Sequence, residues 1–120
     1  MKRDMELVRL LLLQYEAESP PAELADYEQQ EIIYNLVLMR DAGLIDAYPL
    51  EGNDVLPRGF MNVRLTWAGH DFLDAARNDT VWNKAKGEFL KPGISWTFSI
   101  LLEWLKQEAR KKFFGDTPSS

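Results

Sequence analysis

Hydrophobic residues recur at helical spacing over most of the chain and alternate with polar residues in one short part of it. The helical spacing predicts helices over residues 4–16, 27–42, 67–77, 81–90 and 96–113. Ser19 as a cap and Pro20 at the first helical position predict a short helix that ends near Ala25, with a short extended turn as the alternative. Alternation predicts strands over residues 44–48 and 61–65, joined by a loop rich in turn-forming residues. The order of these elements predicts an α+β fold that is mostly helical.

The stretch over residues 61–77 passes from a strand straight into a helix. In its first part hydrophobic and polar residues alternate: Met61, Asn62, Val63, Arg64 and Leu65. Thr66 can then cap a helix, because its hydroxyl can accept a hydrogen bond from an amide of the first turn. A strand that leads into a capped helix, after an earlier helix that ends at Gly43, is typical of a winged helix-turn-helix domain.

We therefore expect a single winged-helix-like domain over residues 1–114. The two strands would form its β-hairpin wing, and the helices after the wing would be a C-terminal extension. Residues 115–120 are expected to be a disordered tail, because a short polar terminus has little to pack against.

One face of the predicted helix over residues 27–42 has a role that the pattern leaves open. It carries Tyr27, Gln30, Glu31, Tyr34, Leu38 and Asp41. In a helix-turn-helix this face meets the major groove, where Gln30 could read an adenine. It has no Lys or Arg, however, and aromatic residues are enriched at protein interfaces. Cover by the C-terminal helix, DNA contact, and protein contact through Tyr27, Gln30, Tyr34 and Leu38 all stay open.

The last predicted helix, capped by Ser95, has an unusually wide hydrophobic face. One stripe consists of Phe98, Leu101, Leu102, Leu105 and Ala109. An adjoining stripe of Trp96, Ile100 and Trp104 widens the face to roughly 200°, about twice the usual width. Either the helix is enclosed within the domain, or its tryptophan side meets a second protein. Terminal helices of winged-helix proteins often form dimer seams, so we favour a homodimer through Trp96, Ile100 and Trp104.

The net charge of −5 is unevenly distributed along the chain. Residues 1–50 hold four Lys or Arg against ten Asp or Glu, while residues 51–120 hold ten against nine. Neutralising phosphates drives much of DNA binding, so the acidic first half disfavours duplex DNA as a partner. A DNA-binding regulator would have to use Gln30, Arg58 and Arg64. An acidic mimic of DNA is a third hypothesis, which requires carboxylates spaced like phosphates.

Residue types that carry chemistry are scarce in this sequence. There is no cysteine, and His70 is the only histidine. His70 and Asp74 lie one helical turn apart, but two ligands make a weak metal site. No Gly-rich phosphate loop, secretory leader or apolar run of about 18 residues is present. We therefore expect a non-enzymatic, cytoplasmic protein without cofactor, metal or membrane span.

Four stretches carry a resemblance to known sequences: MKRDM at residues 1–5, DAGLI at 41–45, LTWAGHDFLD at 65–74 and DTVWNK at 79–84. Together they resemble an uncharacterised family of small bacterial and prophage-encoded proteins, known as a domain of unknown function. The resemblance spans nearly the whole chain, although residues 16–27 look shorter and richer in proline than the family. It implies a winged-helix-like fold and a setting on a phage or mobile element. It implies no activity and no functional residues.

Overall fold

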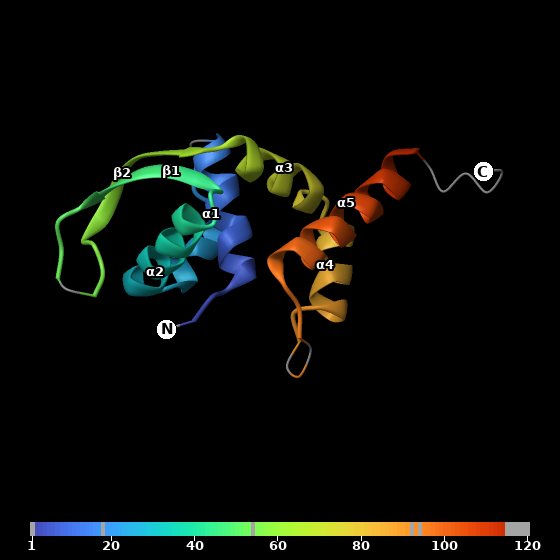
Figure 1. Ribbon diagram of the computed structural model, residues 1–120, viewed down its shortest axis with the longest axis horizontal. Helices are drawn as coiled ribbons and strands as arrows, with labels where there is room; N and C mark the ends of the chain where they lie inside the picture. The colour runs from blue at the N-terminus through green and yellow to red at the C-terminus, as the bar shows by residue number, and fades with distance from the viewer. Residues whose placement is uncertain (1, 18, 54, 92, 94, 115–120) are drawn as a thin grey trace. The chain divides into compact units, whose positions relative to one another are not determined.

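The computed structural model describes residues 2–17, 19–53, 55–91, 93 and 95–114 (Figure 1). Along the chain, its elements are α1 (Met5–Ala17), the 3-10 helix η1 (Ala22–Asp26), α2 (Gln29–Asp41), β1 (Ile45–Leu50), β2 (Gly59–Leu65), α3 (Trp67–Ala76), α4 (Asp79–Glu88) and α5 (Phe98–Phe114). Five α-helices and a two-stranded antiparallel sheet in the described part confirm the predicted α+β, mostly helical class.

Contacts along the chain divide it into two compact units, Met1–Leu73 and Asp74–Ser120. The first unit holds α1, η1, α2 and the hairpin, and the second holds α4 and α5. A single winged-helix domain over residues 1–114 stays a prediction. The predicted tail over residues 115–120 lies outside the described residues.

Helix α1 is buried around most of its circumference. Its buried residues are Met5, Leu7, Val8, Arg9, Leu10, Leu11 and Leu12. The Asp4 carboxylate accepts a hydrogen bond from the Leu7 amide at 3.1 Å and so caps the helix. Because α1 contacts η1, α2 and β2, residues on several sides of it are buried. Tyr15, near the end of the helix, is half-buried, and burial raises its pKa.

Helix α2 begins at Gln29, two residues later than predicted, after Glu28 donates its backbone N–H to the Glu31 carboxylate at 3.1 Å. The side chain of Asn35, in the middle of the helix, is 1% exposed. Its Oδ1 accepts from the Asp4 amide at 2.9 Å, and its Nδ2 donates to the Glu31 carbonyl at 3.0 Å. This amide therefore ties the start of α1 to α2.

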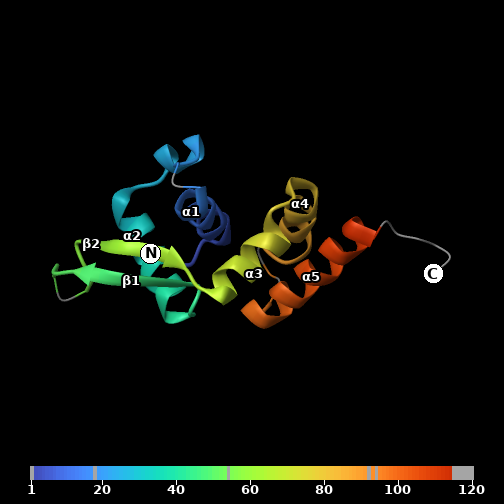
Figure 2. The same cartoon turned by 90° about the horizontal axis from the view of Figure 1, so that it is seen from above.

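Strands β1 and β2 form an antiparallel hairpin (Figure 2), and their register contains a bulge. Asp46 faces Arg64 and Tyr48 faces Met61, so two steps along β1 match three along β2. The bulge includes Asn62, whose φ of 55° is a left-handed conformation that asparagine tolerates. The bulge shifts the alternation of β2. Strict alternation over residues 61–65 would place Met61 on the same side as Val63, but Met61 lies on the other side and is 51% exposed.

The junction between α2, the hairpin and α3 is built as predicted. Gly43 ends α2 with a φ of 79°, which favours glycine. The Thr66 hydroxyl accepts from the Gly69 amide at 3.1 Å and donates to the Gly43 carbonyl, which confirms the predicted cap of α3. Gly69 packs so closely that a Cβ there would lie 2.0 Å from the Leu44 carbonyl oxygen.

Helices α4 and α5 of the second unit pack against each other. Lys84 of α4 contacts Glu108 of α5, and the ring of Phe89, directly after α4, meets the Trp104 ring edge-on, with centroids 5.4 Å apart. The α5 helix begins at Phe98, and the Thr97 hydroxyl accepts from the Ile100 amide at 3.2 Å. The sequence prediction that Ser95 caps this helix is therefore wrong, because a second hydroxyl residue lies nearer the first turn.

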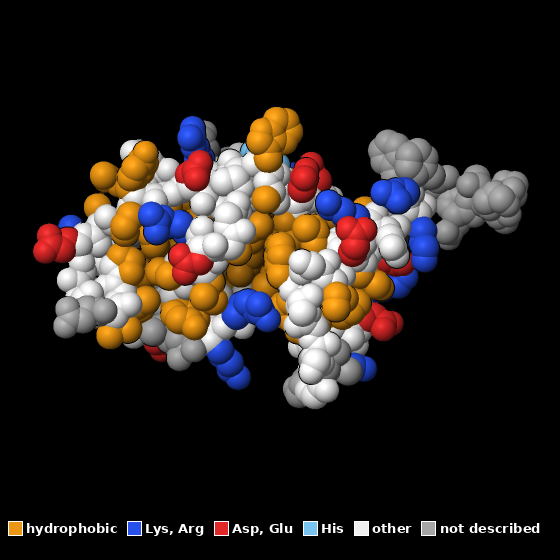
Figure 3. Space-filling model, in the orientation of Figure 1, with side chains coloured by type: hydrophobic (Ala, Val, Ile, Leu, Met, Phe, Trp, Pro, Cys, Tyr) orange, Lys and Arg blue, Asp and Glu red, His pale blue; other side chains and the backbone are white. Residues whose placement is uncertain are grey.

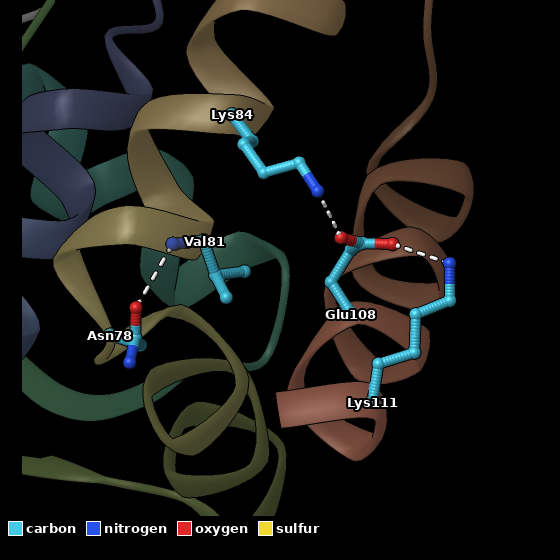
Figure 4. A network of polar contacts seen from close by, with 5 residues as sticks. All are labelled: Asn78, Val81, Lys84, Glu108 and Lys111. Atoms are coloured by element: carbon cyan, nitrogen blue, oxygen red, sulfur yellow. Dashed lines mark hydrogen bonds and ion pairs between the residues drawn. The ribbon is translucent and has the colours of Figure 1, made fainter. Parts of the chain in front are cut away.

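Glu108 joins the two helices through a pair of lysines (Figure 4). The side chain is buried, and its two oxygens accept from Lys84 of α4 at 2.8 Å and from Lys111 of α5 at 3.1 Å. These two hydrogen bonds lower the pKa of the Glu108 carboxyl. The network therefore explains how a charged residue is accommodated on the inner side of α5.

Candidate functional site

Large hydrophobic side chains are exposed on the outer side of the hairpin. Tyr48 is 61% exposed, and Trp67, the first residue of α3, is 88% exposed. Along β1, Ile45 and Ala47 are buried while Asp46 and Tyr48 are exposed, so the alternation gives the hairpin an inner and an outer side. Met61 faces Tyr48 in the register and therefore shares its outer side.

A charged pair lies between these hydrophobic side chains. Arg64 faces Asp46 in the register, and the Arg64 Nε lies 3.5 Å from the Asp46 Oδ2. Along the upper edge of Figure 3, over the strands and the start of α3, hydrophobic side chains stand on both sides of a basic and an acidic side chain. We call this surface the outer hairpin face. It consists of Asp46, Tyr48, Met61, Arg64 and Trp67.

Two open hollows meet at the charged pair. One, of about 760 Å³, extends from Asp46 and Arg64 toward Arg40 and Gly43. The other, of about 570 Å³, extends from the same pair toward Trp67 and His70. Because Trp67 lines a hollow together with Asp46 and Arg64, it belongs to the same side of the hairpin. The face is thus uneven, with an aromatic side chain beside a space large enough to receive one.

The free edge of β1 is poorly suited to pairing with another strand. Arg40 donates from its Nε to the Ala47 carbonyl at 3.0 Å and so occupies an acceptor of that strand. Pro49 has no N–H to donate. Charged side chains and proline are common protections of exposed strand edges. A partner of this hairpin would therefore contact its outer face and not extend its sheet at β1.

The partner-binding residues predicted on α2 are less accessible than the outer hairpin face. Tyr27, Tyr34 and Leu38 are half-buried, and only Gln30 is exposed. Tyr27 lies just before α2, as the residue that ends η1. Burial raises its pKa, and nearby carboxylates raise it further: Asp4, Glu6, Glu31 and Asp26. Such a ring of carboxylates is unfavourable for phosphates, and a protein contact here stays a prediction.

The predicted dimer seam has one widely exposed member. Ile100 is 53% exposed on α5, whereas Trp96 and Trp104 are half-buried. Trp104 uses its ring to pack on Phe89 within the same unit. The wide hydrophobic face of α5 is therefore partly used inside the chain, and its role as a dimer seam stays a prediction.

The residues predicted to contact DNA are spread over the first unit. Arg58 donates its backbone N–H to Leu50 near the loop of the hairpin, whereas Arg64 lies near the opposite end of β2. Six residues of strand separate them by about 20 Å. Gln30 is in the first turn of α2. Arg64 also has a carboxylate beside it, so the three residues do not combine into one basic strip.

The His70 and Asp74 pair is not joined by a third metal ligand. Within the described ranges, no group of three or more His, Cys, Asp or Glu is placed to hold a metal ion. Asp74 instead pairs with Arg77 at 3.1 Å. In the same part of the chain, no helix has the length and hydrophobicity needed to cross a membrane.

Sequence reasoning missed most of the outer hairpin face. Tyr48 could have been found, because it alternates with Ile45 and Ala47 in the predicted strand. Met61 could not, because the alternation alone places it with Val63. Trp67 was interpreted only as the start of a helix, and its exposure depends on how that helix leaves the sheet.

Comparisons with known proteins show that this chain has sequence relatives. A family model described as "Hypothetical protein (DUF2513)" matches residues 2–95. An "Uncharacterized protein" of Haemophilus influenzae (strain ATCC 51907 / DSM 11121 / KW20 / Rd) is 35% identical over 116 residues, which cover 92% of this chain and 93% of that protein. No solved structure matches. The outer hairpin face lies entirely within the residues that the family model matches.

Proposed function

Because the chain belongs to the DUF2513 family, whose description names no activity, its function has to be inferred from its own surface. From that surface we propose that the protein is a non-enzymatic binding module that acts through protein–protein contacts. The outer hairpin face is the surface that makes these contacts.

The exposure of Trp67 is the observation that carries this proposal. A tryptophan side chain that is 88% exposed leaves a large apolar area in water. Tryptophan, tyrosine and arginine are the residues that dominate binding energy at protein interfaces. All three types occur on the outer hairpin face, and they stand next to hollows that a partner's side chains can fill.

The proposal includes a winged-helix-like domain in which the hairpin is the wing. It is supported by the order of helices and strands in the first unit and by the capped entry into α3 at Thr66. A cytoplasmic location and an origin on a phage or mobile element belong to the same proposal. Their support is the absence of cysteine from the sequence and the resemblance in residues 41–45 and 65–74.

A DNA-binding regulator is the second candidate function. One observation favours it: Arg40 and Arg64 line the same hollow at the base of the hairpin. Two observations oppose it, namely the net charge of −5 and the carboxylate of Asp46 beside Arg64. A protein that binds duplex DNA through phosphates needs more basic groups on one surface.

Trp67→Ser tests the proposal, and Val55→Ser is its matched control. Both replace a widely exposed hydrophobic residue of the first unit, but only Trp67 belongs to the outer hairpin face. Proteins retained from a host extract by immobilised wild type should be retained by the control and lost by Trp67→Ser. Retention by all three chains would show that the face is not the binding surface.

Duplex DNA of random sequence, titrated with the same proteins over a range of salt concentrations, tests the alternative. Weak binding that does not change with Arg64→Ala is expected. Tight binding that falls steeply with salt, and that Arg64→Ala weakens, would show that phosphates are being neutralised. The regulator would then replace the protein-binding module.

A further inference from the structure

We propose that the partner of the outer hairpin face is a second copy of this chain, bound face to face about a two-fold axis. The axis runs parallel to the strands and passes between β1 and β2. This inference rests on the proposed protein-binding function and names the partner. The observation that carries it is the register of the hairpin, because each cross-strand pair on the face consists of two groups that attract each other.

A two-fold axis brings two copies of the same face into contact only if the axis lies in the plane between them. Each surface patch must then complement itself, since every contact occurs twice. An axis along the strands places β1 of one copy over β2 of the other. Each residue then meets the counterpart of its own cross-strand neighbour. Asp46 meets Arg64 of the second copy, and Tyr48 meets Met61 of the second copy.

An axis across the strands gives a poorer match. It would place the Asp46 and Arg64 pair over the Tyr48 and Met61 pair, so that two charged groups would lose water against apolar side chains. Burying charges without partners is costly. The pairing of the hairpin therefore selects the axis along the strands, which also agrees with the nearly aligned packing of stacked sheets.

The Asp46–Arg64 pair should stabilise the dimer more than it stabilises a single chain. In one chain the side chains of Arg64 and Asp46 are 78% and 59% exposed, so water screens their attraction. In the dimer each carboxylate lies near two guanidinium groups, and the four charges form a network with less water around it. The contact between Tyr48 and Met61 adds a favourable interaction of sulfur with an aromatic ring.

A second copy on the face would also cover Trp67, because this residue lines a hollow together with Asp46 and Arg64. Its side chain is 88% exposed in one chain, so burying the indole ring adds apolar area to the interface. The hollow of about 760 Å³ opens at the same charged pair and can receive a side chain of the second copy.

A charge exchange tests the proposal. Asp46→Arg gives a face with two positive charges, and Arg64→Asp gives a face with two negative charges. Each variant alone should dimerise at least about tenfold more weakly than wild type, because like charges meet in both contacts. An equimolar mixture of the two variants should form a heterodimer, because the opposite faces attract. The double variant should dimerise like wild type.

Sedimentation velocity from about 5 μM to about 1 mM measures these states, since a face of this size predicts a weak dimer. Glu23→Arg, at an exposed position of η1, is the control for a charge change away from the face and should dimerise like wild type. Thermal melts establish that each variant is folded. A wild type that stays monomeric throughout, or a mixture without heterodimer, would overturn the proposal.

The failure of this inference can be told from the failure of the proposed function. A monomeric protein that retains a host protein, and loses it with Trp67→Ser, would overturn the second copy and leave the protein-binding module standing. A monomeric protein with no retention that depends on Trp67 would overturn both.

Discussion

Arg64 on β2 lies 3.5 Å from Asp46 on β1, and both side chains remain largely in water. Exposed ion pairs contribute little to folding, so we expect Arg64→Ala to change the free energy of unfolding by less than about 0.5 kcal/mol. Urea unfolding measures this, with Arg58→Ala as the control for losing an arginine elsewhere on the hairpin. A loss above about 1.5 kcal/mol would mean that Arg64 serves the fold and not a partner.

Gly69 cannot accept a side chain, because a Cβ would lie 2.0 Å from the Leu44 carbonyl oxygen. Relieving this overlap would disturb the hydrogen bond between that oxygen and the Thr66 amide. We expect Gly69→Ala to cost about 3 kcal/mol or more.

Gly87→Ala is the matched control, because a Cβ at Gly87 of α4 would have nothing within 4 Å. It should raise stability by about 0.5–1 kcal/mol, since alanine is the better helix former. Thermal melts of both variants measure the two effects. Equal melting temperatures would contradict the close packing of α3 on the hairpin.

Asn35 should be needed to hold the start of the chain. Asn35→Ala removes the acceptor for the Asp4 amide and the donor to the Glu31 carbonyl, and we expect a loss of about 2 kcal/mol. Hydrogen exchange at the Asp4 amide should become faster. Gln30→Ala, at an exposed position of the same helix, should change neither quantity. An unchanged exchange rate in Asn35→Ala would contradict the tie between α1 and α2.

Glu108 should make the stability of α4 and α5 depend on acid. Hydrogen bonds from Lys84 and Lys111 lower its pKa, so the folded state holds the ionised form more firmly than the unfolded state does. This stabilisation is complete above the ordinary carboxyl value of 4.5 and is lost as the pH falls through the lowered value.

Glu108→Gln should therefore be less stable than wild type by about 1 kcal/mol at neutral pH, since both lysines are partly exposed. The difference should shrink in acid, as denaturant unfolding at several pH values would show. Glu103→Gln, at an exposed position of α5, is the control. A difference that stays constant down to about pH 2.5 would contradict the role of the Glu108 charge.

Local chemistry explains which parts of the fold the sequence predicts well. Thr66 caps the helix that follows it, and Gly43 ends the helix before it in a left-handed turn, so each depends on neighbouring residues. The sequence therefore predicts both. The buried positions of α2 follow from helical spacing. Asn35 fails this reasoning, because its partners at the start of α1 lie more than thirty residues away.

The sequence predicts only those features of the candidate site that depend on neighbouring residues in the chain. Arg64 and its exposure followed from alternation, but its pairing with Asp46 depends on the register of two strands. The exposure of Met61 depends on a bulge that no sequence motif predicts. Tyr27, Tyr34 and Leu38 looked equally available in sequence, and in the structure all three are half-buried.

The bulge at Asn62 has a consequence for comparing relatives of this chain. The part of β2 between the bulge and the loop follows one alternation, and the part before α3 follows the other. A relative that lacks one residue here would lose the bulge and still place Met61 opposite Tyr48, whereas a relative that keeps the residue without the bulge would turn Met61 to the inner side. Alignments of this hairpin should therefore be anchored separately at its two ends, and a gap at position 62 leaves the outward-facing set of side chains unchanged.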